Sequence, residues 1–141
     1  MKNGTNGKSH KIAYIDGVAH QIKSDHTSIL KFVREHVGEK KIPTLCDDSN
    51  LAPYGACRVC SVDIALQKDG ATKTVASCHT PVTENSYIIT DNKDLKNLRK
   101  NIVELVLTDH PMTCSTCEVN NNCELQTLAN DLDISEHRYN K

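Results

Sequence analysis

The cysteines of this chain are grouped, and together with one histidine they have the spacing of metal ligands. All seven cysteines belong to two groups, and each group contains one C-x2-C pair that places two thiolates within reach of one metal centre. Two further soft ligands complete each group, so no thiol is left over. The first group is Cys46, Cys57, Cys60 and Cys78, and the second group is His110, Cys114, Cys117 and Cys123. The sequence therefore predicts two metal centres with four protein ligands each.

The first group has the layout of a [2Fe–2S] site. Its spacing, C-x10-C-x2-C-x17-C, places three thiolates on one loop and the fourth far along the chain. The first gap is longer than in the C-x4-C-x2-C pattern of plant-type ferredoxins. Gly55 and Ala56 stand directly before Cys57 and have little side-chain bulk. We expect backbone N–H groups to approach the cluster sulfurs there and to stabilise the reduced cluster.

The second group combines three thiolates with one imidazole, which is enough to hold each iron of a [4Fe–4S] cluster by one ligand. A neutral imidazole in place of a thiolate removes a negative charge, so we expect it to raise the reduction potential of this centre. Between the last two cysteines, residues 120–122 are all Asn. They offer amide donors and a tolerance for left-handed backbone, or they form an ordinary polar loop.

Other uses of these residues fit the spacing less well. C-x2-C pairs also occur in zinc ribbons and knuckles, but those sites often pair two knuckles, whereas each group here has one knuckle and two distant ligands. An odd number of cysteines argues against a disulfide framework. A single catalytic thiol does not fit grouped cysteines. The remaining histidines show no ligand spacing, and we interpret them as surface residues or as neighbours of the clusters: His10, His20, His26, His36, His79 and His137.

Hydrophobic periodicity and turn residues predict the strands and the helix that could position the first group. Strands over 11–15 and 18–22 flank an Asp-Gly dipeptide that suits a tight hairpin. An amphipathic helix begins with apolar residues from Ile29 and ends at Gly38, a typical C′ residue. The ligand-bearing segment 43–56 has the composition of a long loop. Further strands are expected over residues 60–66, 72–76 and 87–90. Together these elements predict an α+β fold with a β-grasp, [2Fe–2S] ferredoxin-like sheet.

A second helix is expected to lead into the second group, with Asp91, Asn92 or Asp94 as its N-cap. Its end is set by Pro111, which restricts the residue before it to extended geometry. We expect one face of this helix to be core: Leu95, Leu98, Ile102, Leu105 and Val106. We expect the opposite face to be solvated, or alternatively to dock an acidic redox partner: Lys93, Lys96, Arg99 and Lys100. A short helix is predicted around residues 125–132.

The predicted organisation is a disordered tail, a β-grasp domain and a small, mostly helical iron–sulfur domain. Their boundaries are 1–10, 11–91 and 92–141. A chain of 141 residues with one Phe, four Tyr and no Trp cannot build a large core, so metal binding is expected to be part of folding. The net charge of −1 provides no basic field for nucleic acid. With no secretory signal and no apolar run of spanning length, we expect a cytoplasmic protein whose membrane association comes only through partners.

Four stretches give the sequence a specific family resemblance: PTLC at 43–46, YGACRVC at 54–60, DHPMTCSTC at 109–117 and CELQ at 123–126. They resemble the amino-terminal region of the large iron–sulfur subunit of NADH-quinone oxidoreductase (complex I). The same module resembles the start of NAD-dependent formate dehydrogenase alpha subunits and of diaphorase or iron-only hydrogenase subunits. The resemblance runs from about residue 12 to the C-terminus.

The resemblance implies one [2Fe–2S] cluster on the first group and one His(Cys)3-ligated [4Fe–4S] cluster on the second. It also implies an electron-transfer module of an NAD(H)-linked multisubunit oxidoreductase. Such a module relays single electrons between a flavin- and NADH-oxidising subunit and a further iron–sulfur or catalytic subunit. No substrate active site is expected in this chain. Two alternatives remain open here: a stand-alone ferredoxin-like carrier and a structural zinc-binding interaction module.

Overall fold

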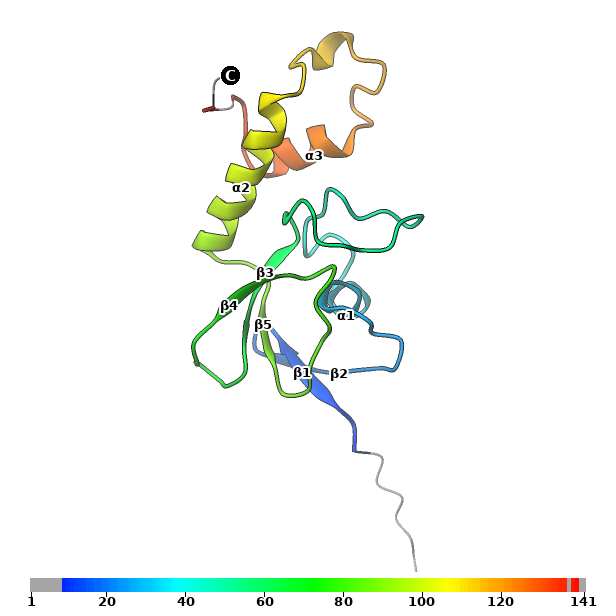
Figure 1. The fold of residues 1–141 in the computed structure, drawn as a ribbon, viewed down its shortest axis with the longest axis vertical. Coiled ribbons are helices and arrows are strands. Elements are labelled where there is room, and N and C mark those ends of the chain that lie inside the picture. The colour runs from blue at the N-terminus through cyan, green and yellow to red at the C-terminus, as the bar shows by residue number, and fades with distance from the viewer. Residues whose placement is uncertain (1–8, 137, 140–141) are drawn as a thin grey trace, which may run out of the picture.

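The computed structural model describes residues 9–136 and 138–139. The tail predicted over 1–10 therefore falls mostly outside the described residues, and so does His137. Within the described part, a lobe built on a β-sheet comes first and a smaller helical lobe follows (Figure 1).

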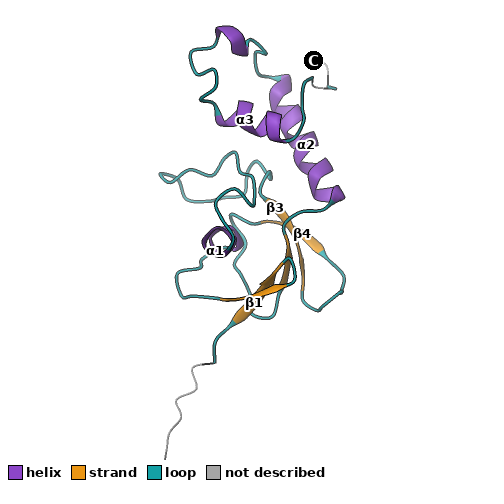
Figure 2. Ribbon diagram, turned by 180° about the vertical axis from the view of Figure 1, so that it is seen from behind, coloured by secondary structure: helices purple, strands orange, loops and turns teal. Residues whose placement is uncertain are grey.

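The first lobe contains five strands in one mixed sheet, in the order β2-β1-β5-β3-β4. Their bounds are β1 Ile12–Ile15, β2 Val18–Gln21, β3 Ser61–Ala65, β4 Lys73–Ala76 and β5 Tyr87–Ile89. β1 and β5 are parallel, and the other neighbouring pairs are antiparallel. The helix α1, Ile29–His36, packs on this sheet (Figure 2). The predicted α+β fold, with a helix packed across the sheet, is confirmed.

Local sequence explains how the first lobe begins. The hairpin between β1 and β2 turns at Asp16 and Gly17, whose φ values of 48° and 86° are those that an Asp-Gly turn supplies. The Ser28 side chain caps α1 by accepting a hydrogen bond from the Lys31 N–H at 3.2 Å. Gly38 follows the helix with φ 141°. Ser28 thus fixes the start of α1, and Gly38 follows its end as predicted.

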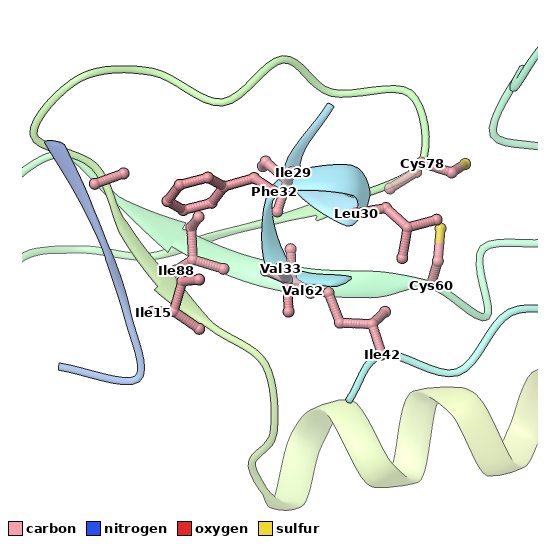
Figure 3. Close-up of a cluster of buried hydrophobic side chains, with 12 residues drawn as sticks. Ile15, Ile29, Leu30, Phe32, Val33, Ile42, Cys60, Val62, Cys78 and Ile88 are labelled. Carbon is pink, nitrogen blue, oxygen red and sulfur yellow. The ribbon is translucent and has the colours of Figure 1, made fainter. Parts of the chain in front are cut away.

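The core of the first lobe lies between α1 and the sheet (Figure 3). Phe32 and Val33 of α1 are fully buried, and they pack with sheet residues such as Val62 and Ile88. The same buried cluster includes two cysteines, Cys60 and Cys78. The first predicted ligand group is therefore built into the main core of the molecule.

The helical lobe consists of α2, a 3-10 turn η1 and α3. Their bounds are α2 Lys93–Thr108, η1 Cys114–Thr116 and α3 Glu124–Asp131. Asn92 caps α2, because its side-chain oxygen accepts a hydrogen bond from the Leu95 N–H at 2.8 Å. The buried core of this lobe is small: Val59, Val103, Leu107, Leu128, Ala129 and Ile134. Val59 comes from the ligand loop of the first lobe, so this core joins the two lobes.

The apolar stripe predicted for α2 was partly wrong. Leu105 and Val106 are exposed by 54% and 37%, while Arg99, predicted to be solvated, is only 4% exposed. The residues that α2 buries are Leu95, Arg99, Val103, Glu104 and Leu107. Arg99 enters the buried face because it binds backbone carbonyls of the sheet lobe, a partner that helical periodicity does not reveal. In the part of the chain that the structure describes, no helix combines the length and apolar character needed to cross a bilayer.

Candidate metal centres

Strand pairing brings two ligands of the first group together. Cys60 directly precedes β3, and Cys78 follows β4 by two residues. Because β3 and β4 pair antiparallel with Ser61 opposite Ala76, the two cysteines must lie side by side. They are 2% and 4% exposed and stand at one end of the core, beside Leu30 (Figure 3).

Hydrogen bonds fix the turn that carries Cys57 and Cys60. Arg58 adopts the left-handed conformation, with φ 65°, and its carbonyl accepts hydrogen bonds from the Ser61 N–H at 3.1 Å and from the Ser61 hydroxyl at 2.6 Å. The Cys60 carbonyl accepts a hydrogen bond from the Ser77 hydroxyl at 2.6 Å. The Val59 N–H, inside the turn, donates to Cys57 Sγ at 3.4 Å. This turn therefore directs an N–H group at the sulfur of a predicted ligand, an interaction that tunes iron–sulfur clusters.

Gly55 approaches the first group as the sequence predicted. Its backbone forms a hydrogen bond with Cys78, in which only the N–H can donate to the sulfur. Its φ of 69° is a conformation that L side chains rarely adopt, and a Cβ there would lie 3.5 Å from the Cβ atoms of Ala76 and His79. Glycine at this position thus allows a backbone donor to reach the sulfur.

The electrostatics of Cys78 argue against a reactive thiol and are compatible with the predicted role as a metal ligand. Burial, together with the neighbouring Cys60 and Cys46, raises the pKa of its thiol to about 12. The same interactions show that three of the four predicted ligands lie close together. Such a thiol becomes a thiolate only when a cation replaces its proton, so this donor set fits a metal centre and not a nucleophile.

All four members of the second group line one cavity of about 390 Å³ in the helical lobe. His110 stands just past α2, Cys114 opens η1, Cys117 ends it and Cys123 is the N-cap of α3. Most other lining residues are apolar, among them Leu107, Pro111, Met112, Val119, Leu125, Ala129 and Ile134. Four soft donors around one largely apolar cavity fit an iron–sulfur cluster. Cys114 and Cys123 are half-buried, while His110 and Cys117 are exposed to solvent.

Gln126 organises the loop between the last two cysteines, and sequence reasoning missed it. Its Nε2 donates to Asn120 Oδ1 at 2.9 Å, and its Oε1 accepts from the Asn121 N–H at 2.8 Å. Asn121 is left-handed, with φ 64°, as the Asn run suggested. The available signal was position: Gln126 lies three residues after Cys123, in the first turn of α3, facing back toward the loop.

The two ligand-bearing loops approach each other between the lobes. Cys123 also borders a second cavity of about 350 Å³, whose other wall includes Ile42, Pro43 and Thr44 at the start of the first ligand loop. In addition, Cys57 packs against the apolar cluster that contains Val59 and α2. The two predicted centres therefore border one interface between the lobes.

Another group of metal-ligand type lies outside these centres. The ligand atoms of Asp25, His26 and Glu35 lie within 4.8 Å of one another. Glu35, however, already binds the Lys23 ammonium and His26 Nε2, and His26 Nδ1 accepts from the Lys23 N–H at 3.0 Å. These contacts show that the group is part of a network of ion pairs and hydrogen bonds with Lys23. The prediction that places His26 at the surface or beside a cluster was wrong, because its side chain is fully buried in this network.

Two family models match the chain. The model described as "2Fe-2S iron-sulfur cluster binding domain" matches residues 13–93, which is more than half of the chain. The model described as "NADH-ubiquinone oxidoreductase-G iron-sulfur binding region" matches residues 99–138. The matches meet close to α2, and they support the predicted pair of a [2Fe–2S] and a [4Fe–4S] cluster.

Curated relatives are redox subunits. The chain is 36% identical over 98 residues to the NADPH-Fe(3+) oxidoreductase subunit alpha of Geobacter sulfurreducens, covering 70% of the chain and 11% of that protein. It is 39% identical over 105 residues to the NADP-reducing hydrogenase subunit HndD of Solidesulfovibrio fructosivorans, covering 70% and 17%. It is 30% identical over 115 residues to the NADH-ubiquinone oxidoreductase 75 kDa subunit of Reclinomonas americana, covering 82% and 16%. The chain thus spans less than a fifth of each of these relatives.

A solved structure shares the fold. A chain of an NAD+-reducing [NiFe]-hydrogenase in the H2-reduced state aligns with a TM-score of 0.76 and 22% identity. The alignment covers 92% of this chain and 52% of that one. Both lobes are therefore part of a known arrangement.

Proposed function

Because the chain belongs to the family of 2Fe-2S iron-sulfur cluster binding domains, we propose that it is a two-cluster relay for single electrons. Residues 11–91 form the [2Fe–2S] domain of this relay and residues 92–141 form the [4Fe–4S] domain. The [2Fe–2S] ligands are Cys46, Cys57, Cys60 and Cys78. The [4Fe–4S] ligands are His110, Cys114, Cys117 and Cys123.

One observation carries this proposal: the two ligand groups converge on a shared interface. Four soft donors line a single cavity in the helical lobe, and the 57–60 turn packs into the core of the same lobe through Val59. Electron transfer between two redox centres is faster through covalent bonds and packed protein atoms than across an open gap filled with solvent. The arrangement thus supports transfer from one cluster to the other within the chain.

The clusters, when bound, supply one-electron redox chemistry. The residues of the chain bind and tune them. Buried cysteines at the end of the sheet core exclude water, the Gly55 and Val59 N–H groups donate to ligand sulfurs, and His110 offers a neutral donor that lowers the negative charge of the second site.

The partners of this relay follow from its relatives. Their names are those of NADH-, NADPH- and NADP-linked oxidoreductase subunits, which are parts of larger assemblies. We propose a flavin- and NAD(P)H-oxidising subunit on one side of the relay and a further iron–sulfur or catalytic subunit on the other. The site of action is then the cytoplasm, with any membrane contact made by those partners.

Elemental and EPR analysis of the anaerobically prepared chain tests the relay. We expect about six irons and six acid-labile sulfides per chain, and two EPR signals after reduction. Cys57→Ala should abolish the [2Fe–2S] signal alone. A colourless chain loaded with zinc would show a structural interaction module instead, and retention of the [2Fe–2S] signal in Cys57→Ala would reassign the first site.

His110→Cys tests the second ligand set. A thiolate adds a negative charge, so the variant should keep a [4Fe–4S] cluster and lower its reduction potential. The matched control is His79→Cys, because His79 lies outside the second cavity and its ring nitrogen contacts the Pro53 carbonyl instead. An unchanged redox titration of the second centre in His110→Cys would show that His110 is not a ligand.

A further inference from the structure

Arg99 places a buried positive charge against the first ligand group. It is 4% exposed and extends from α2 to the sheet lobe, where its Nη2 donates to the carbonyls of Ser61 and Thr90, both at 2.7 Å. Ser61 directly follows the predicted ligand Cys60, and the Arg99 and Cys60 charges interact. A side chain of the second domain thus reaches the base of the first centre.

Two carboxylates, Asp91 and Asp63, lie near the charge of Arg99. Its Nη1 lies 3.9 Å from Asp91 Oδ1, and Asp91 is half exposed and also 3.5 Å from the Lys96 ammonium. Asp63 is near as well, and hydrogen bonds from Thr74 and Asn92 hold its carboxylate in place without removing its charge. The Arg99 Nε is buried with no hydrogen-bond partner in the described part of the chain. Arg99 thus holds a buried cation beside Cys60, next to the half-exposed carboxylate of Asp91 and the buried carboxylate of Asp63.

The guanidinium stays charged in this position. Burial lowers the pKa of Arg99, while Asp91, Cys60 and Asp63 raise it. Its ordinary pKa is so high that it keeps its proton even when buried. The two carbonyls that it binds also hold its position, since its Nη2 donates one N–H to each of them.

We propose that Arg99 is a positioning residue that raises the reduction potential of the [2Fe–2S] centre by holding a buried cation beside Cys60. This inference rests on the proposed function. Reduction adds one negative charge to the cluster, and a nearby cation stabilises the reduced form more than the oxidised form. The effect is strong in a buried site, where the dielectric is low and salt screens little.

Potentiometric titration of the cluster-loaded full chain with dithionite, followed by EPR, tests this role. Arg99→Met is compared with Lys93→Met, which removes the same charge from an exposed position on the same helix. We expect the [2Fe–2S] potential to fall in Arg99→Met and to stay near the wild-type value in Lys93→Met. The [4Fe–4S] potential should move less than the [2Fe–2S] potential in Arg99→Met. Equal shifts in the two variants, or equal shifts of both clusters, would overturn the proposal.

Two further variants test whether Arg99 raises the [2Fe–2S] potential if Arg99→Met fails to fold. Asp91→Asn removes a partly compensating carboxylate at an exposed site, so it should raise the [2Fe–2S] potential. Arg99→Lys keeps the charge and loses the guanidinium that binds the two carbonyls, so its potential should lie between those of the wild type and Arg99→Met. An unchanged or lower potential in Asp91→Asn would refute the electrostatic role. If the wild-type chain shows no [2Fe–2S] signal at all, the proposed function itself fails, which is a distinct result.

Discussion

The two predicted cluster sites are held by scaffolds of unequal strength. Among the described residues, the core of the sheet lobe contains twelve buried residues, and two of them are the predicted ligands Cys60 and Cys78. The core of the helical lobe contains six, and one of these, Val59, belongs to the ligand loop of the other lobe. The first site is embedded in a core that strand pairing already defines, whereas the second lies in a cavity at the side of two packed helices.

This difference suggests which site depends more on its metal. When iron is absent, burial favours the neutral thiol at Cys78, and a neutral cysteine packs like a small apolar residue. The sheet core can therefore remain intact without a cluster. In the helical lobe, three cysteines and His110 line a cavity that packing alone leaves open, so the lobe gains much of its stability when a cluster joins these segments.

Removing both clusters should produce the largest contrast between the lobes. After treatment with an oxidant and a chelator, we expect amides of α3 and of residues 110–123 to lose most of their protection in hydrogen exchange. Amides of the central strands β1, β3 and β5 should keep most of theirs, because their hydrogen bonds belong to the sheet. Equal loss of protection in both lobes would show that the first lobe needs its metal as much as the second.

Phe32→Ala should reduce the difference in stability between the two lobes, because it weakens the core of the sheet lobe. The ring is fully buried and is the largest apolar side chain in that core, so its loss should cost about 3–5 kcal/mol. Hydrogen exchange of the slowest sheet amides measures this cost as a fall in the free energy of unfolding. The matched control is Val18→Ala, because Val18 is 58% exposed and should have almost no effect. A cost below about 1 kcal/mol for Phe32→Ala would mean that the core does not rest on this ring.

Val59→Ala should destabilise the helical lobe although the residue belongs to the sheet lobe. Val59 is fully buried among Val103, Leu107 and Leu128, and deleting its two methyl groups should cost about 2 kcal/mol. The expected result is faster loss of the [4Fe–4S] EPR signal during incubation, with a smaller change in the [2Fe–2S] signal. If the [2Fe–2S] signal decays faster instead, Val59 stabilises the 57–60 turn and not the interface between the lobes.

Local signals in the sequence identified most of the elements. The Asp-Gly hairpin, the capping residues Ser28 and Asn92, and Gly38 act within a few residues of their own positions, so their structural effect could be predicted. The ligand groups were equally visible, because metal chemistry restricts the residue types. The structure places His110 and the three cysteines of its group around one cavity. The assignment of each ligand stays a prediction.

Long-range partners explain what the sequence did not reveal. Arg99 resembles any exposed cation on a helix, yet it is buried because its two acceptors lie 38 and 9 residues away in sequence. Glu104 is likewise 1% exposed, and it is paired with Arg138 from the end of the described chain. His26 is buried because Glu35 of α1 binds it. Periodicity reports which face of a helix is apolar, but it contains no information about an ionic partner supplied by another element.

The smallest difference between the two sites lies in the side-chain hydrogen bonds that hold each ligand-bearing loop. Gln126 holds the second loop through two hydrogen bonds, and its replacement by Leu should cost about 1 kcal/mol for each bond lost. Ser77 holds Cys60 in the first loop, but in Ser77→Ala the backbone N–H at position 77 still donates to the Cys60 carbonyl, at 3.4 Å. Gln126→Leu should therefore speed iron loss from the second centre more than Ser77→Ala speeds it from the first.

Gln126→Glu separates the two bonds made by Gln126. Its carboxylate can still accept from the Asn121 N–H but cannot donate to Asn120, so the rate of iron loss should lie between those of the wild type and Gln126→Leu. The rates are measured by trapping released iron with a coloured chelator while EPR identifies the decaying cluster. If all three proteins release iron at one rate, the loop is held by its cluster alone, and the helical lobe depends on its metal even more than its small core suggests.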